Sequence, residues 1–428
     1  MRIAIVGSGI AGLGCAHALR GSASVTLFEA APRLGGHTNT VDITVEGQRL
    51  AVDTGFLVFN ERTYPQLIRL FAELGVPTAA SDMSFGLSVA LPSGRRLEWA
   101  GANLATVFAQ PRNLVSPVFL RMLGDLLRFN AHATRLVTND AVPMQQTLGA
   151  YLDANRYGAE LRDWYLLPMA AAIWSCPLDA MLDYPAATFL RFCHNHGLLQ
   201  VEGRPKWFTV PGGARQYVAA IARQVDDVRL ATPVLAVRRL GNGEVAVTSA
   251  HGVERFDHVV LACHADQSLR LLADAHGAER TVLGACRYQP NRAVLHTDRQ
   301  LLPRARRVWS AWNYLSYGAS AQASACVSVT YLLNRLQPLP VRTPVMVSLN
   351  PLREPAREHV LAEFDYEHPV FDARAIEAQR RLPSLQGRGG VWFAGAWTGY
   401  GFHEDGLRSG VEVAAALLER RSAGRLAA

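Results

Sequence analysis

The sequence has few charged residues and almost no lysine. Charged residues make up 18% of the 428 residues, and Lys206 is the only lysine, so 42 of the 43 basic residues are arginine (43 − 1 = 42). The formal net charge is +7, but the arginines form no block of the kind that binds nucleic acid. We therefore expect no nucleic-acid partner. The positive charge fits anionic ligands such as phosphates, a membrane surface, or the coding bias of a GC-rich genome.

Paired cysteines and metal-ligand clusters are also missing. The six cysteines are scattered and form no C-x-x-C motif, and the one metal-like cluster, CHNH at 193–196, has no second cluster to complete a ligand set. These absences exclude a disulfide scaffold and a zinc site, and a chain of this length can bury an adequate core without them. We expect reduced thiols, no metal and a cytoplasmic location.

Long hydrophobic runs are absent as well. The longest, Trp164–Trp174, is broken by Pro168 and is shorter than the ~20 residues that span a bilayer. The apolar N-terminus carries regularly placed glycines and leads into a strand pattern, unlike a signal peptide. One segment, 112–136, places arginines among apolar residues and predicts an amphipathic helix pair. This pair either packs within its own domain or makes peripheral contact with the inner face of the membrane.

The N-terminal segment predicts a dinucleotide site. A short apolar strand (3–6) leads into the loop GSGIAG (7–12) and a helix, and a second strand (25–28) ends in Glu29, 22 residues after Gly7 (29 − 7 = 22). Gly7 provides the tight turn, Gly9 lets a pyrophosphate approach the backbone, and Gly12 lets the helix pack on the strand. The free N–H groups at the helix start would bind phosphates, and Glu29 would accept hydrogen bonds from a ribose.

Further glycine-rich segments favour FAD over NAD. A second glycine pair, Gly35-Gly36, closely follows the ribose acid and brings Arg33 near the phosphates. At the far end, a strand (391–396) leads into a glycine-rich loop (397–406) and a helix that begins at Leu407. The N-terminus of this helix would stabilise negative charge on the pyrimidine end of a reduced flavin. Because no cysteine follows Cys326, we expect FAD to be bound noncovalently.

The middle of the chain supplies the remaining predicted cofactor contacts. Val234 is expected to meet the adenine through its backbone, and Ala262 is expected near the pyrophosphate. The full set of predicted cofactor-binding residues is Gly7, Gly9, Ile10, Ala11, Gly12, Glu29, Ala30, Arg33, Gly35, Gly36, His37, Thr54, Gly55, Phe56, Val234, Ala262, Gly395, Ala396, Gly401, Phe402, Asp405, Gly406 and Leu407.

Cofactor signals at both ends and in the middle of the chain predict two interleaved domains. We expect an FAD-binding domain from 1–80, 203–265 and 385–428, and a substrate domain from 81–202 and 266–384. The predicted fold class is α/β, a Rossmann-like FAD-binding domain interleaved with an α+β substrate domain.

Together these segments resemble the flavin amine oxidase superfamily nearly end to end. The finer resemblance is to bacterial NAD/FAD-binding oxidoreductases, and its motifs are GHTNT (36–40), DTGF (53–56) with VFN (58–60), NHGLL (195–199), WSAWNY (309–314) and GFHEDG (401–406). These proteins are similar to the oxidase-like part of plant cyclopropane fatty acid synthases and to desaturases of methyl-branched acyl chains. The resemblance therefore implies the two-domain fold of amine oxidases and phytoene desaturases, and a lipid substrate.

The sequence departs from the amine oxidase pattern at three positions. Ala396 replaces the acid that usually follows the last strand, and His37 replaces the arginine after the glycine pair. Amine oxidases also place a lysine near flavin N5, after the adenine-side strands, whereas Lys206 precedes the glycine pair at 212–213. These departures argue against amine oxidation but not against the fold.

Four residues are candidates for catalysis. His403 and Glu404 lie in the loop predicted at the flavin, and Asn313 and Tyr314 interrupt an apolar strand. Asp405 is also suited to cap the final helix. Aromatic candidates for the pocket wall are Trp164, Trp174, Trp207, Trp309, Trp312, Tyr314 and Tyr331.

The expected function is FAD-dependent dehydrogenation of an apolar substrate, a methyl-branched or unsaturated fatty-acyl chain, with hydride transfer to flavin N5. Oxygen or a carrier would reoxidise the flavin. Three alternatives stay open: a flavin amine oxidase, an isomerase that uses reduced flavin, and a non-catalytic FAD-binding partner of a lipid-modifying enzyme.

Overall fold

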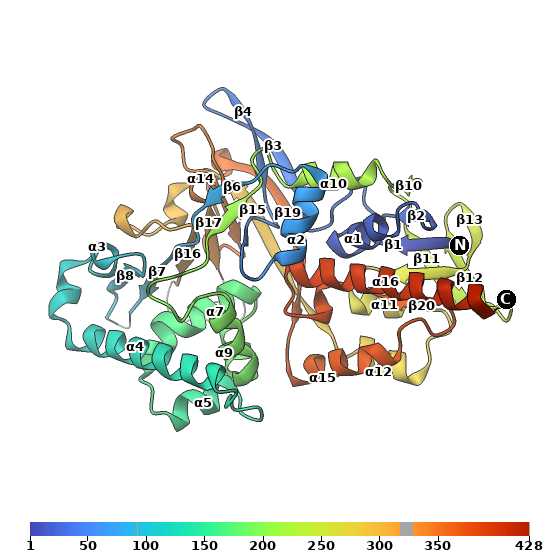
Figure 1. Cartoon of the computed structure of the whole chain (residues 1–428). Helices are drawn as coiled ribbons and strands as arrows, with labels where there is room; N and C mark the ends of the chain where they lie inside the picture. Colours follow the sequence, from blue (N-terminus) through green and yellow to red (C-terminus); the bar gives the residue numbers. More distant parts are fainter. Residues whose placement is uncertain (92, 317–327, 428) are drawn as a thin grey trace.

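Two lobes, each built around one sheet, make up the molecule (Figure 1). The computed structural model describes residues 1–91, 93–316 and 328–427, so Cys326 lies outside the described residues. Both termini lie in the lobe on the right of Figure 1. The mixture of a parallel sheet, a second multi-stranded sheet and helices confirms the predicted α/β fold class.

A parallel sheet forms the centre of the right-hand lobe. Its described strands, in sheet order, are β10 (Asp227–Arg229), β2 (Ser24–Phe28), β1 (Arg2–Val6), β14 (His258–Leu261) and β20 (Val391–Phe393). After the exposed first residue, β1 is buried throughout, as its apolar sequence predicts. Because β1, β2, β14 and β20 run parallel, the loops that follow them meet at one edge of the sheet, where ligands bind in such folds.

The first and last long helices of the chain pack tightly together beside this sheet. They are α1 (Ile10–Leu19), with nine of its ten residues buried, and α16 (His403–Ala427). The backbones approach so closely that a Cβ on Gly410 would overlap the carbonyl oxygen of Ala11. On the facing side, a Cβ on Gly14 would lie 2.5 Å from a methyl group of Leu407. This contact brings the two ends of the chain to the same edge of the parallel sheet.

The left-hand lobe contains a larger, mostly antiparallel sheet. Its described strands, in sheet order, are β19 (Val360–Val370), β15 (Arg287–His296), β18 (Met346–Leu349), β17 (Val329–Leu332), β16 (Trp312–Leu315), β7 (Phe85–Ala90) and β8 (Arg96–Ala100). The long β15–β19 pair lies between the two lobes in Figure 1. This pair therefore carries side chains from the second sheet to the edge of the first.

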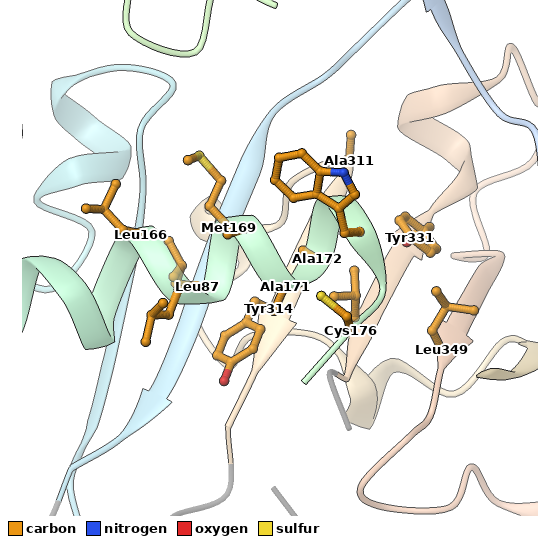
Figure 2. Packing of buried hydrophobic residues seen from close by; sticks show 14 of the residues in the cluster. Leu87, Leu166, Met169, Ala171, Ala172, Cys176, Ala311, Tyr314, Tyr331 and Leu349 are labelled. Carbon is orange, nitrogen blue, oxygen red and sulfur yellow. The ribbon is translucent and has the colours of Figure 1, made fainter. Parts of the chain in front are cut away.

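Helices cover the larger sheet with an extensive apolar core. They are α3 (Leu104–Val107), α4 (Pro117–Thr138), α5 (Leu148–Ala154), α6 (Ala159–Leu161), α7 (Leu167–Trp174), α8 (Leu178–Leu182), α9 (Ala186–Asn195) and α14 (Leu333–Leu336). Figure 2 shows α7 crossing the strands, with Ala171 and Ala172 close to Tyr314. These small side chains let the helix lie near the sheet, and the dense packing makes this part of the molecule rigid.

The remaining elements connect or flank the lobes. They are the hairpin β3 (Thr40–Val45) and β4 (Gln48–Asp53), the small sheet of β5 (Phe59–Asn60), β9 (Trp207–Thr209) and β6 (Ala79–Ser81), the sheet of β11 (Val234–Arg239), β12 (Val245–Ser249) and β13 (Gly252–Phe256), and the helices α2 (Pro65–Leu74), α10 (Arg215–Ala222), α11 (Ala265–Leu271), α12 (Gly277–Leu283) and α15 (Ala373–Arg381).

The predicted domain boundaries at 265/266 and 384/385 stay predictions, and the packing of the neighbouring helices bears on where they lie. The strands of the parallel sheet fall within the predicted FAD-binding ranges, and those of the larger sheet fall within the substrate ranges. However, α11, α12 and α15 pack with β14 and β20 of the parallel sheet in one buried cluster. The apolar faces of these helices therefore belong to the FAD-binding side of the molecule.

The predicted amphipathic helix pair at 112–136 is also corrected. A short 3₁₀ turn, η1 (Pro111–Val115), precedes the single helix α4. The break falls at Ser116, whose side chain accepts the N–H of Phe119, and Pro117 starts the helix with no N–H to leave unsatisfied. None of the described helices is long and apolar enough to cross a membrane.

Replacing Gly410 with valine is expected to separate α1 from α16. The added methyl groups would overlap the backbone of α1, and overpacking of this kind costs about 1–3 kcal/mol. We predict a lower Tm by differential scanning fluorimetry and a lower content of bound flavin. Ala415→Val on the exposed side of α16 is the control and should leave both unchanged. Equal Tm values for the two variants would show that the helices do not depend on this close approach.

Candidate active site

One large cavity of about 1110 Å³ joins the edge of the parallel sheet to the larger sheet. Its wall includes the loops after β1, β2, β14 and β20, and it continues between α7 and strands β16 and β17. The cavity therefore collects residues from both ends and the middle of the chain, as the predicted cofactor signals require.

The start of α1 forms an open anion-binding surface. Gly9 precedes the helix in an extended conformation, and no described side chain caps the helix N-terminus. Space above Gly9 is free, since a Cβ there would have no described atom within 4 Å. Gly7 turns the chain with φ of 105°, and its N–H donates to the carbonyl of Phe28. Free N–H groups, a helix dipole and open space together fit a pyrophosphate.

Glu29 fixes the shape of this turn from the end of β2. One carboxylate oxygen accepts the N–H and the hydroxyl of Ser8 at 2.9 and 2.5 Å, and the other accepts the N–H of Ala31 at 2.9 Å. Ser8 in turn receives the N–H of Gly35, so the two glycine loops are joined. Sequence reasoning missed Ser8, although its place between Gly7 and Gly9 is a signal for such a bond.

The adenine side is built by a connection to β11. Val234 is buried and lines the cavity, as does Thr232, whose N–H donates to the carbonyl of Glu29 at 2.8 Å. Ala262 lines the cavity after β14, with its N–H bonded to the carbonyl of Val6. The structure thus brings the three predicted parts of a dinucleotide site together.

Several histidines gather on one part of the cavity wall. His37 stacks on Tyr366, with ring centroids 5.1 Å apart, and lies near His368 and His264. Burial and the neighbouring histidines lower the pKa of His37 well below its usual range. Its buried Nε2 has no hydrogen-bond partner among the described residues. A buried polar atom at a cavity wall is costly unless a ligand satisfies it.

His403 is held rigidly at the start of α16. Its ring stacks on Phe56 with centroids 3.8 Å apart, and its Nε2 shares a hydrogen bond with the hydroxyl of Tyr217 at 2.8 Å. Burial lowers the pKa of His403 to about 3, so the ring is neutral at neutral pH. The predicted catalytic residue therefore lines the cavity as an oriented, uncharged imidazole.

The structure places most of the predicted cofactor-binding residues on the cavity wall. They are Gly7, Gly9, Ile10, Ala11, Glu29, Ala30, Gly35, Gly36, His37, Thr54, Gly55, Phe56, Val234, Ala262, Gly395, Ala396, Gly401 and Phe402. The sequence analysis did not identify other wall residues, among them Tyr366 and His368. Their alternate positions along β19, which place both on one face of the strand, were a signal that could have found them.

Five predicted cofactor-binding residues do not line the cavity. Gly12 lies behind the loop, where a Cβ would overlap the carbonyl oxygen of Gly7. Arg33 is exposed and donates weakly to the carbonyls of Leu34 and Thr38 at 3.4 Å. Gly406 contacts Ile10 at the start of α1, and Leu407 packs on Gly14. These residues shape the site from outside its wall.

Asp405, the fifth of these residues, organises the last glycine-rich loop. One of its carboxylate oxygens accepts the N–H groups of Tyr400 and Phe402, both at 3.1 Å, and the other pairs with Arg408. Asp405 therefore bonds the backbone of its own loop, in agreement with its suitability as a cap. The prediction that Asp405 contacts the cofactor directly is corrected, because this residue does not line the cavity.

The catalytic role predicted for Glu404 is corrected by its hydrogen bonds. Both carboxylate oxygens are occupied, by the N–H groups of Gln66 and Leu67 at 2.8 and 3.0 Å. Glu404 thus caps the start of α2, and it is not part of the cavity wall. Burial raises the pKa of Glu404, while these backbone bonds oppose the rise.

The predictions for Asn313 and Tyr314 are corrected as well. The amide of Asn313 is fully buried and bonds the backbone of Ser310 and Thr330, which holds the strand in place. Tyr314 packs in the core beside α7, and burial raises its pKa to about 12. Trp312 faces the cavity instead, opposite Tyr331 on β17, with ring centroids 4.8 Å apart.

The substrate end of the cavity is mostly apolar. Its wall includes Met83, Phe85, Tyr165, Met169, Ile173, Phe192, Leu198, Trp207, Phe208, Trp312, Tyr331 and Leu349. Of the seven aromatic candidates, Trp207, Trp312 and Tyr331 line the wall. Lys206 and Arg204 are exposed at its rim.

The family model for flavin-containing amine oxidoreductases matches residues 10–301, more than half of the chain. The chain therefore belongs to the flavin-containing amine oxidoreductase family. Among curated proteins, it is 28% identical over 302 residues to a carotenoid phi-ring synthase of Streptomyces griseus. This alignment covers 63% of the chain and 54% of the relative, so the chain spans about half the length of that protein.

Solved structures of the same fold act on different compounds. A fatty acid isomerase from P. acnes superposes with a TM-score of 0.67 at 13% identity, over 97% of this chain and 98% of that one. Wild-type putrescine oxidase bound to putrescine superposes with a TM-score of 0.66 at 18% identity, over 98% and 99%. At these identities the superpositions show the fold alone.

The residues of the cavity fit FAD. The uncapped start of α1, the acid at the end of β2 and the unpaired Nε2 of His37 are distributed along one continuous wall. Gly9 would hold the pyrophosphate and Glu29 the ribose, and the wall near His37 and His403 would hold the ring. Noncovalent attachment stays a prediction.

Replacing Glu29 with alanine is expected to weaken FAD binding at least tenfold, a cost of about 1.4 kcal/mol. The variant loses the bonds that shape the loop at Ser8 and Ala31, and the expected ribose acceptor. Fluorescence titration of the flavin-free protein with FAD measures the Kd. Glu377→Ala, an exposed glutamate on α15, should keep the wild-type Kd. An unchanged Kd for Glu29→Ala would exclude this placement of the ribose.

The depressed pKa of His403 predicts acid-sensitive stability. Below its ordinary value of 6.5, the unfolded chain binds a proton at this residue while the folded protein does not until about pH 3. Its contribution to stability is therefore complete above 6.5 and is lost as the pH falls toward 3. We predict that His403→Phe flattens the decline of Tm with falling pH, whereas the exposed control His251→Phe leaves it unchanged. A parallel decline in His403→Phe and wild type would contradict this.

Proposed function

We propose that the protein dehydrogenates a fatty-acyl chain that lies in the substrate end of the cavity. The observation that carries the proposal is the continuity of the cavity, in which the predicted flavin region leads directly into an apolar slot. A lipid substrate and its oxidation are supported by this shape and by the chemistry of the wall.

The slot has walls suited to a long hydrocarbon. Met169 and Ile173 lie one turn apart on α7, and Trp312 and Tyr331 come from neighbouring strands. These side chains offer apolar surface with few polar groups, as acyl-binding pockets do. The indole N–H of Trp312 is buried with no acceptor among the described residues, which leaves one donor for a polar substrate group.

The charges on the cavity wall bear on whether an ammonium group could bind. Burial lowers the pKa of His196 and of His368 to about 4, and both are neutral at neutral pH. Of the described wall residues, the acids are Glu29, Asp82 and Glu367, and each already has a partner. Glu29 bonds Ser8, Asp82 pairs with Arg335, and Glu367 lies 3.3 Å from His264. Only Asp82 is paired with an arginine, so Glu29 and Glu367 are the wall acids that an ammonium group could use, and neither belongs to the apolar slot.

The residues of this chain position and desolvate the substrate. When bound, FAD supplies a hydride acceptor at N5, while the adjacent carbon loses a proton and a carbon–carbon double bond forms. Trp312 and Tyr331 would orient the chain, and the apolar wall would exclude water. Neutral His403, fixed by Tyr217 and Phe56, would form an uncharged part of the wall. The proton would pass to the unpaired Nε2 of His37 on the same wall or to solvent at the cavity mouth.

The named relatives support a lipid substrate more than an amine. One is a carotenoid synthase and one a fatty acid isomerase, whereas putrescine oxidase retains the amine alternative. The isomerase also gives a reason to test reduced flavin without net oxidation.

Anaerobic flavin reduction tests the proposal. The FAD-loaded protein is mixed with a straight-chain fatty acid, a methyl-branched fatty acid or putrescine, and flavin absorbance is followed. We expect bleaching by a fatty acid, with a new double bond detected by mass spectrometry. Bleaching by putrescine alone would favour amine oxidation. A shifted double bond only after prereduction would favour an isomerase, and intact flavin with a co-purifying enzyme would favour a non-catalytic partner.

Filling the slot should separate substrate binding from cofactor binding. Ile173→Trp adds bulk to the α7 wall, so we predict at least a tenfold slower flavin reduction by the fatty acid and an unchanged flavin content. Leu235→Trp, on an exposed side of β11, is the matched control. If Ile173→Trp reacts at the wild-type rate, the acyl chain does not lie along α7.

A further inference from the structure

Exposed apolar side chains concentrate in one short part of the molecule. Eleven large hydrophobic residues are exposed among those that the structure describes, and five of them fall between residues 104 and 127. We call these five the docking face: Leu104, Leu114, Val115, Leu120 and Leu127. Leu104 is 76% exposed and Val115 is 80% exposed. They lie on two short helical turns, α3 and η1, and their apolar side chains project into solvent.

Helix α4 has two faces with different environments. Phe119, Met122 and Phe129 are buried on the inner face and pack into the core of the larger lobe. Leu120 and Leu127 lie one heptad apart on the outer face, with Arg121 and Arg128 beside them. The buried apolar side chains of α4 thus lie on its inner face. On the outer face, Arg128 bonds Asp125 and the backbone at Asn155.

Arginines surround the docking face. Arg95, Arg112 and Arg304 lie around one surface recess, and Arg121 follows Leu120 on α4. The sequence has no aspartate or glutamate from 99 to 124 or from 299 to 307. The nearby Glu98 is 2% exposed, and its carboxylate is occupied by the N–H groups of Arg304 and Ala305. The face therefore combines projecting leucines with positive charge.

This combination matches the surface of an anionic lipid bilayer. Leucine tips can enter the boundary between headgroups and acyl chains, while arginines keep their charged ends at the phosphates. Basic residues near such a surface add electrostatic attraction to the anionic headgroups. A partner protein would need a complementary acidic and apolar patch, whereas a bilayer supplies both features over its whole area.

The docking face also adjoins the cavity. Gly101 and Ala102 are exposed, line the cavity wall and lead directly into α3, which carries Leu104. We propose that the docking face binds an anionic membrane and that the cavity opens toward the bilayer beside α3. Delivery of an acyl substrate along this route rests on the proposed function, but membrane binding itself does not.

Vesicle flotation with the full, FAD-loaded protein tests the proposal. Vesicles contain either phosphatidylcholine alone or phosphatidylcholine mixed with phosphatidylglycerol, at low and at high salt. We expect binding to the mixed vesicles that weakens with salt, and little binding to phosphatidylcholine. The variant Leu104→Ser/Leu114→Ser/Val115→Ser should lose at least tenfold in vesicle affinity. The control Leu235→Ser/Val253→Ser removes two exposed apolar residues of the other lobe and should bind normally.

Two results would overturn membrane docking. One is the absence of binding to anionic vesicles, and the other is equal binding by the triple variant and the control. If vesicle binding is absent and the wild type forms a dimer that the triple variant loses, the face binds a second copy of the chain instead. Flavin reduction by a detergent-dispersed fatty acid is measured in parallel. Vesicle binding without flavin reduction would refute the proposed function and leave the docking proposal supported.

Discussion

The close packing of α1 on α16 is the constraint on which the site depends. The two helices can approach closely because Gly14 and Gly410 have no side chains at the contact. This approach places the loop 395–403 beside the loop 7–12. The serine at 409 reinforces it, since its hydroxyl accepts the N–H of Gly395 at 2.9 Å. Both helices therefore begin at the cavity wall, at Ile10 and His403, where their positive ends favour an anionic cofactor.

Burial then sets the chemistry of the wall. Histidines that would titrate near neutral pH in water are neutral here, because desolvation lowers their pKa values, and His403 is also fixed by stacking and by Tyr217. The wall acids are engaged by neighbouring groups. The slot beside α7 is a mostly apolar space that can orient a substrate and exclude water, which is the main task of a protein around a flavin. The exposed leucines and arginines near α3 provide a surface that is also suited to lipid.

The cofactor side was largely predictable from the sequence, whereas the substrate side was not. Gly7, Gly9 and Glu29 form a local motif whose spacing is set by a strand, a turn and a helix, so their positions follow from the chain itself. Trp312, rather than Asn313, faces the cavity because strand side chains alternate and only tertiary packing decides which face is inward. Glu404 caps α2, a helix more than 300 residues away, and no local pattern indicates such a bond.

The central claim is that one cavity holds the cofactor and an acyl chain end to end. A crystal structure of the FAD-loaded protein with a long-chain fatty acid tests it most directly. The account predicts continuous density for the chain between α7 and the Trp312–Tyr331 pair, with one end at the flavin ring beside His403. Density for the fatty acid elsewhere on the protein, or an ordered FAD that itself fills the space along α7, would contradict it.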